Sequence, residues 1–290
     1  MGFDPKSVAI ATITYFPKWY KGTLRSIKHT DKVRGDLALE TCRNAAILDY
    51  QMVASDGGSS KTFTKELSGI NGIFVIKKRN KKRSPGKRMS IRVASKLAGI
   101  KVIVILEVEK VSMITKCIIQ IAEPIINGLA DVVVPKREQN LFKSTYPEYM
   151  FESEMEGNKI YNEILRANNL LNPSLESLDM FFGPRAFRND KKIIALFMRK
   201  YHILSSEYFD SEEWSNTLYF PIALALKKNY RVQSVTVPFA YPNTQRDNEE
   251  KGERELFLEK RKAQRLGLLV ELLHFINYLE KNRNSRMKLK

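Results

Sequence analysis

The stretch KVIVILEVEK, residues 101–110, decides the fold that this sequence is expected to adopt. Its first half is an apolar run dominated by Val and Ile, which is typical of a strand buried on both faces of a parallel sheet. Two carboxylates, Glu107 and Glu109, follow one residue apart. Because residues i and i+2 of a strand point to the same face, we expect these acids to lie side by side at the carboxyl end of the strand. Their mutual repulsion requires a positive charge nearby.

Strand patterns and helix patterns alternate outward from this stretch. Strands are expected at 7–16, 50–55, 72–78, 100–108, 130–136 and 230–239. Helices are expected at 19–50 in two pieces, and at 90–99, 112–127, 155–168, 191–200, 213–228 and 249–281. The last is amphipathic, with Leu266, Leu269, Leu273 and Ile276 on one face. This alternation predicts an α/β fold with a mostly parallel sheet, whose ligands bind beyond the carboxyl ends of the strands.

The composition limits the class of protein. The chain has 290 residues, of which 43% are hydrophobic, so a sizeable core is expected in one large domain or two small ones. No apolar run reaches the roughly 18–20 residues that span a bilayer, and the first residues are typical of a strand rather than a signal peptide. The two cysteines, Cys42 and Cys117, give no disulfide framework and no zinc spacing. The expected location is the cytoplasm.

The net charge of +17 predicts an anionic partner, either nucleic acid, a membrane surface or a phosphorylated ligand, unless the charge serves only solubility. The densest basic segment, KKRNKKRSPGKRMSIR at 77–92, follows the third expected strand. A turn at Pro85-Gly86 would place backbone N–H groups, Lys87 and Arg88 around a diphosphate. The spacing is not that of a Walker A loop. A solvated loop, a nucleic-acid patch and a membrane contact are the alternatives.

Further candidates are acidic. Asp56, in ASDGGSS at 54–60, could accept hydrogen bonds from a nucleobase or a ribose, or it could stabilise the turn. Glu107 and Glu109 suit Mg²⁺ or Mn²⁺, or one of them could pair with Lys110 or with the basic segment.

A general base could come from one of three acids. Glu212 and Glu213 precede Trp214, and Asp179 lies in LDMFFGPRAF. Glu212 and Glu213 could equally be acids of the first turn of a helix. The histidines at 29, 202 and 274 have no metal-ligand spacing.

These motifs, in this order, resemble the GT-A glycosyltransferases, close to the family 2 type and similar to polyprenol-phosphate or mannosyl- or glucosylglycerate synthase-type enzymes. The matching stretches are VAIATITYF, SDGGSS, SPGKRMSIRVASKLAG, GLADVVVPKRE and the position of Glu107-Val108-Glu109, where the family has an Asp-x-Asp motif. The resemblance covers residues 7–140 and extends loosely to 240. It implies a GT-A, Rossmann-like, mostly parallel sheet flanked by helices, with a helical C-terminal extension.

The resemblance implies a cytoplasmic hexosyltransferase that uses a UDP- or GDP-linked sugar donor. Thr14, Tyr15 and Asp56 would contact the base and ribose, and Lys87 and Arg88 would lie near the diphosphate. Glu107 and Glu109 would hold Mg²⁺ or Mn²⁺. The remaining donor-binding candidates are the neighbours of these residues, namely Phe16, Gly57, Gly58, Ser59, Gly86 and Val108.

The implied organisation is a glycosyltransferase domain over 1–245 and a C-terminal amphipathic helix with a basic tail over 246–290. Residues 1–140 would bind the nucleotide sugar and 141–245 the acceptor, a small anionic molecule or a lipid phosphate. A peripheral membrane contact and a homodimer are left open. The rival functions are a nucleotidyltransferase with a similar core and an inactive protein that binds nucleic acid or membranes.

Overall fold

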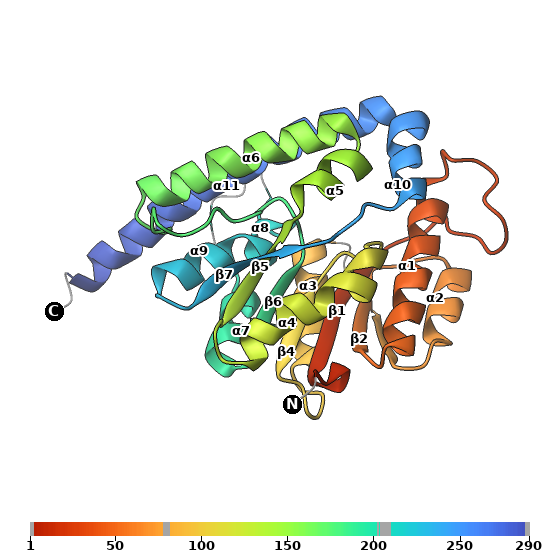
Figure 1. Ribbon diagram of the computed structural model, residues 1–290, viewed down its shortest axis with the longest axis horizontal. Coiled ribbons are helices and arrows are strands. Elements are labelled where there is room, and N and C mark those ends of the chain that lie inside the picture. Colours follow the sequence, from red (N-terminus) through yellow and green to blue (C-terminus); the bar gives the residue numbers. More distant parts are fainter. Residues whose placement is uncertain (1–2, 78–81, 202, 204–209, 288–290) are drawn as a thin grey trace.

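Seven strands form one mixed sheet, in the order β3-β2-β1-β4-β6-β5-β7, in the computed structural model of the chain (Figure 1). The structure describes residues 3–77, 82–201, 203 and 210–287. The strands are β1 (Val8–Thr14), β2 (Gln51–Asp56), β3 (Ile73–Lys77), β4 (Val102–Ile105), β5 (Val132–Arg137), β6 (Arg185–Arg188) and β7 (Val232–Val237). Only β6 runs antiparallel to its neighbours β4 and β5. The predicted α/β class with a mostly parallel sheet is confirmed.

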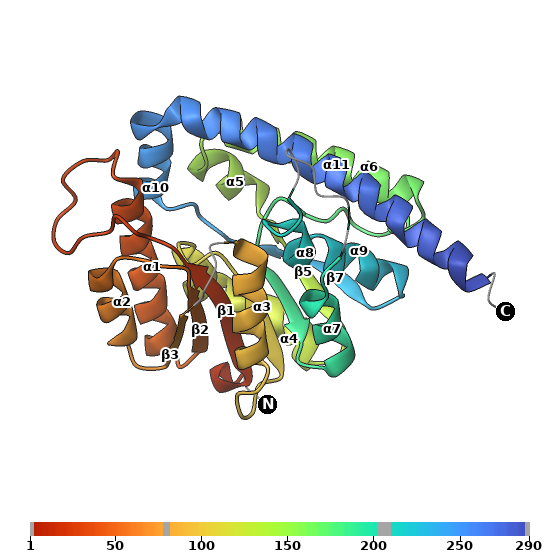
Figure 2. The ribbon, with the colours of Figure 1, turned by 180° about the vertical axis from the view of Figure 1, so that it is seen from behind.

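Helices cover both faces of this sheet (Figures 1 and 2). Helices α1, α2 and α4 pack in one hydrophobic cluster, and α3, α7 and α9 pack in the other. Residues of β1 alternate between the clusters, since Ile10 belongs to the first and Ala11 to the second. The helices are α1 (Thr30–Ile47), α2 (Lys61–Ser68), α3 (Arg83–Ala94), α4 (Ile118–Ile126), α5 (Gln139–Thr145), α6 (Glu148–Ala167), α7 (Lys191–Met198), α8 (Ser215–Leu218), α9 (Phe220–Lys227), α10 (Asn243–Asp247) and α11 (Arg254–Met287).

Two local predictions are wrong near the basic segment and β4. Pro85 and Gly86 do not form a turn but lie in the first turn of α3, where a proline is tolerated because its missing N–H has no partner within the helix. Strand β4 ends at Ile105, so Glu107 and Glu109 do not share a strand face. They lie in a turn, in which the amide of Lys110 donates to the carbonyl of Glu107.

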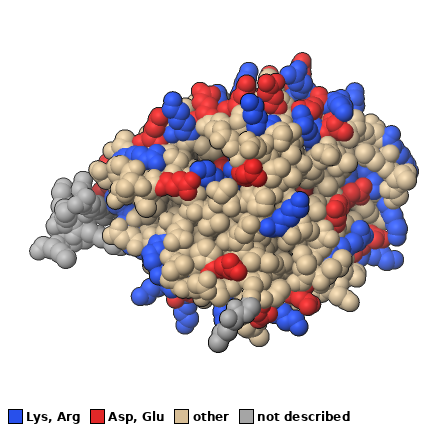
Figure 3. Space-filling view, in the orientation of Figure 1, with Lys and Arg blue, Asp and Glu red and all other residues tan. Residues whose placement is uncertain are grey.

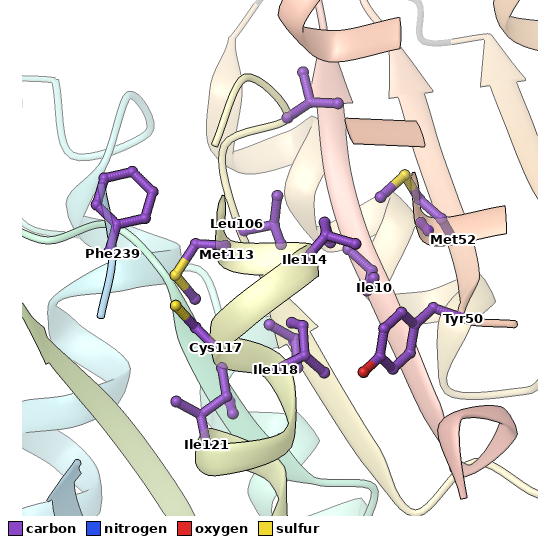
Figure 4. Close-up of a cluster of buried hydrophobic side chains, with 14 of the residues drawn as sticks. Ile10, Tyr50, Met52, Leu106, Met113, Ile114, Cys117, Ile118, Ile121 and Phe239 are labelled. Atoms are coloured by element: carbon purple, nitrogen blue, oxygen red, sulfur yellow. The ribbon is translucent and has the colours of Figure 1, made fainter. Parts of the chain in front are cut away.

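Buried side chains fix this turn on both sides. Leu106 and Met113 flank it in a fully buried cluster, and Val108 is buried within it. Figure 4 shows Ile114 beside Ile10 and Met113 beside Cys117, with Leu106 in the same cluster. The apolar residues of the turn therefore point into the core, which leaves the intervening acids to face the edge of the sheet.

Helices α6 and α11 lie side by side across the carboxyl ends of the strands (Figures 1 and 2). The helical C-terminal extension is thereby confirmed, but its predicted apolar face is rotated. Of the predicted residues, Leu266 and Leu273 are exposed, whereas Ile276 is buried and Leu269 packs against the core; Leu268, Leu272 and Phe275 are buried beside them. Along the described residues no helix is both long enough and apolar enough to cross a membrane.

Candidate active site

A cavity of about 330 Å³ lies at the carboxyl ends of β1, β2 and β4, below α6 and α11. Ligands of parallel α/β sheets bind at this edge. Basic side chains outnumber acidic ones on its wall. The cations are Arg34, Arg83, Lys87, Lys110, Arg137, Lys260 and Arg261, and the acids are Glu107, Glu109, Glu154 and Glu213. The cavity therefore suits an anionic ligand.

Lys87 is the most unusual of these cations because its charge is buried. The residue is 1% exposed, and its amino group has no hydrogen-bond partner among the described residues. It lies 5.2 Å from the centre of the Trp214 ring. Burial lowers the pKa of Lys87 to about 8, and Glu107 opposes that shift. A bound anion would supply the missing partner.

Glu107 faces the cations at the base of the cavity. Its Oε2 lies 4.0 Å from Nζ of Lys110. Burial alone would raise its pKa, but Lys110 and Lys87 outweigh burial and hold the pKa below its usual range. The carboxylate packs on Gly183, where an added Cβ would stand 1.9 Å from Oε1. Arg185 holds this loop by donating to the carbonyls of Met180 and Pro184, each at 2.7 Å.

Glu109 faces a different cation, since its Oε1 lies 3.6 Å from Nη1 of Arg34. The two glutamates therefore have separate basic partners. Glu107 lies within ion-pair distance of Lys110, as one of the two alternatives from the sequence predicted. Among the described residues no group of three His, Cys, Asp or Glu side chains could hold a metal ion. Glu107 and Glu109 lie within ion-pair distance of Lys110 and Arg34, but Oε2 of Glu107 is buried and has no hydrogen-bond partner among the described residues, so the pair leaves an oxygen ligand available to a cation.

The loops after β1 and β2 form one wall. The Thr14 hydroxyl donates to Asp56 Oδ1 at 2.9 Å, and the Ser59 hydroxyl donates to the same oxygen at 2.5 Å. The amides of Gly58 and Ser59 also donate to Asp56, and Gly58 has a φ of +110° that favours glycine. Asp56 thus stabilises the turn, and Tyr15 and Gly57 line the cavity beside it.

Lys87 and Arg88 are adjacent but diverge. Lys87 faces the cavity, whereas Arg88 donates to Glu212 Oε2 at 2.5 Å outside the cavity lining. Asn216 donates to the other oxygen of Glu212 at 2.6 Å. Both oxygens of Glu212 are therefore occupied.

Glu213 does line the cavity. Its Oε2 lies 3.5 Å from Nη1 of Arg83, and its side chain is 39% exposed. The Arg83 guanidinium lies 4.1 Å from the centre of the Trp214 ring. Among the three acids predicted as general bases, Glu213 is the one that reaches the cavity.

Asp179 is buried in an ion-pair network that also borders a second cavity. Arg137 donates from Nε and Nη2 to its two oxygens, each at 2.8 Å, and from Nη1 to Glu154 at 2.5 Å. Asn158 donates to Asp179 at 2.7 Å. Burial alone would raise the pKa of Asp179, but Arg137 outweighs it and keeps the pKa low. These bonds favour a structural role.

The structure brings only part of the predicted donor site together. Thr14, Tyr15, Phe16, Gly57, Lys87, Glu107 and Glu109 line the cavity, whereas Asp56, Gly58, Ser59, Gly86, Arg88 and Val108 do not. Residues 78–81 of the basic segment lie outside the described residues. Sequence reasoning missed Arg34, Arg137, Lys260 and Arg261. Each belongs to a helix or a strand end, where basic residues among other charged residues match no motif.

The chain was also compared with known proteins. No protein-family model matches it, and no curated protein matches it. Among solved structures, it is similar to glucosyl-3-phosphoglycerate synthase from Mycobacterium tuberculosis in complex with phosphoglyceric acid. The identity is 10%, the match covers 90% of this chain and 80% of that chain, and the TM-score is 0.45.

Two further solved structures are similar. TarS from S. aureus has 12% identity over 86% of this chain and 73% of that chain, with a TM-score of 0.39. The 4-diphosphocytidyl-2C-methyl-D-erythritol synthase from Anaerococcus prevotii has 10% identity over 88% of this chain and 100% of that chain, with a TM-score of 0.43. The structural likeness to GT-A glycosyltransferases is thus present at low identity. It assigns neither a reaction nor a substrate to this chain.

Proposed function

We propose that the protein is a glycosyltransferase that moves a sugar from a nucleotide-diphosphate donor to a small anionic acceptor. The observation that carries the proposal is Lys87, a buried ammonium that has no hydrogen-bond partner among the described residues and lies in a cavity at the strand ends. A buried charge without a partner is costly, and a phosphate oxygen is a suitable partner. The donor's base and ribose would lie against Tyr15 and Gly57.

Basic side chains would carry the charge of the leaving diphosphate. Lys87 and Lys110 both lie close enough to Glu107 to lower its pKa. They can stabilise negative charge as the bond between sugar and phosphate breaks. The Mg²⁺ or Mn²⁺ expected at Glu107 and Glu109 stays a prediction, and no step is assigned to a metal. Glu213 would accept the proton of the acceptor hydroxyl.

The test is a thermal-shift panel of UDP-, GDP- and ADP-sugars, with and without Mn²⁺, on the wild type and on Lys87→Met. We expect one donor to raise Tm without a metal, and we expect Lys87→Met to abolish that rise. Lys96→Met is the matched control, because Lys96 is exposed just after α3 and does not line the cavity.

The other outcomes discriminate between functions. A Tm rise that requires Mn²⁺ would support the predicted metal site at Glu107 and Glu109. Stabilisation by nucleoside triphosphates, with release of pyrophosphate, would favour the nucleotidyltransferase. No response to any nucleotide, together with salt-sensitive binding to polyanions, would overturn the proposal in favour of a binding protein. The domain boundaries, the lipid-phosphate acceptor, the membrane contact and the homodimer stay predictions.

A further inference from the structure

We propose that the first turns of α11 complete a second anion subsite, distinct from the diphosphate subsite at Lys87, and that it binds the phosphate group of the acceptor. Arg34 from α1, Arg83 from α3, and Lys260 and Arg261 from α11 form it. That its occupant is the acceptor rests on the proposed function. The anion subsite itself rests on the contacts described below.

Acidic side chains position the arginines of this subsite. Glu249 lies 2.7 Å from Nη2 of Arg34, and Glu154 lies 3.4 Å from Nη1 of Arg261. The Nε atoms of both arginines are buried and have no hydrogen-bond partner among the described residues. The guanidinium groups are thus held in place while part of their donor capacity is unused. Buried donors without partners are uncommon in folded proteins.

Lys260 differs from the arginines because no acid lies within ion-pair distance of it among the described residues. It lines the cavity from α11 together with Arg261 and Gln264. Partial desolvation by the cavity wall lowers the pKa of Lys260 to about 8, although part of the side chain is exposed. Arg34, Arg83 and Arg261 lower this pKa further by repulsion, and Glu249 opposes the shift. The three arginines pair with acids, so Lys260 is the cation of this group that no ion pair offsets among the described residues, and a phosphate group is a suitable partner for it.

The two subsites occupy different parts of the same cavity. Lys87 is buried at the base, whereas Lys260 is exposed and comes from the helix that covers the strand ends. The ring of Trp214 lies against Lys87 and Arg83, one cation from each subsite, so the two subsites adjoin. The proposal places a donor at Lys87 and a phosphorylated acceptor at Lys260.

The test is calorimetric titration of inorganic phosphate into the protein, alone and saturated with UDP or GDP. With the nucleotide present, phosphate should still bind, and Lys260→Gln should weaken that binding by about tenfold or more. Lys262→Gln is the matched control, since it removes the same charge two residues away at an exposed position outside the cavity lining. It should leave phosphate binding within about twofold of the wild type.

The outcomes separate the two proposals. If UDP and GDP bind but Lys260→Gln leaves phosphate affinity unchanged, the second subsite is overturned and the proposed function stands. If no nucleotide binds but Lys260→Gln still weakens phosphate binding, the subsite stands and the proposed function falls. Equal weakening by Lys260→Gln and Lys262→Gln would mean a diffuse charge effect and would also overturn the subsite.

Discussion

At the scale of single residues, Lys87 shows how a binding site can be built at the expense of stability. Its amino group is buried without a hydrogen-bond partner, and its pKa falls from 10.5 to about 8. Such a group opposes folding of the ligand-free protein, because the unfolded chain hydrates the charge fully. Replacing it with an apolar side chain of similar length removes that cost.

We therefore predict that Lys87→Met stabilises the ligand-free protein, by roughly 3 kcal/mol at most. The folded-state pKa is depressed, so the penalty is complete below about pH 8 and declines as pH rises toward 10.5. The stabilisation by Lys87→Met should therefore be smaller at pH 10 than at pH 7. Urea unfolding of both proteins at the two pH values would measure it. A gain that is equal at both pH values would contradict the burial argument.

Glu213, Glu212 and Asp179 are chemically alike but differ in their bonds. We predict that Glu213→Gln lowers kcat by about 10²–10⁴-fold with little change in Tm. Glu212→Gln and Asp179→Asn should instead lower Tm, because each leaves a buried arginine with a neutral partner. Steady-state kinetics and thermal unfolding of the three variants would decide. Full activity of Glu213→Gln would exclude it as the general base.

At the scale of elements, the turn after β4 depends on a glycine from a distant loop. The carboxylate of Glu107 occupies the space above Gly183. We predict that Gly183→Ala displaces the carboxylate from Lys110 and Lys87 and costs about 1–3 kcal/mol of stability. In a Glu107→Ala background the same change should cost much less, and a double-mutant cycle would measure the difference. Additive costs would mean that the two residues do not interact.

Sequence patterns predicted the elements better than the directions of their side chains. All six predicted strands formed, although β4 ends three residues earlier than predicted. Strand β6 was missed because its four residues have an arginine at each end and so show no apolar run. The start of α3 at Arg83 was not predicted, because the basic segment lacks an apolar helical pattern. Successive side chains of a helix differ in direction by about 100°. The sequence could therefore not distinguish Lys87, which faces the cavity, from Arg88, which does not.

At the scale of the whole molecule, the net charge of +17 is not one uniform basic surface. On the face in Figure 3, acidic and basic side chains are interspersed along the edge that α6 and α11 form, and the centre of the face is largely uncharged. The cavity lining, by contrast, has seven basic and four acidic residues. The composition predicted an anionic partner but could not distinguish a basic cavity from a basic surface patch. Most basic residues of the cavity come from α1, α3 and α11, which are far apart in sequence, so only the fold brings them together.

The position of α11 also affects the order in which the protein forms during translation. The strands and loops that carry Thr14, Lys87 and Glu107 leave the ribosome long before Arg254. Domains fold as their residues emerge, starting from the N-terminal side. We expect a nascent chain stalled before Arg254 to hold a formed sheet that lacks Lys260 and Arg261, so the proposed acceptor subsite would form later than the sheet.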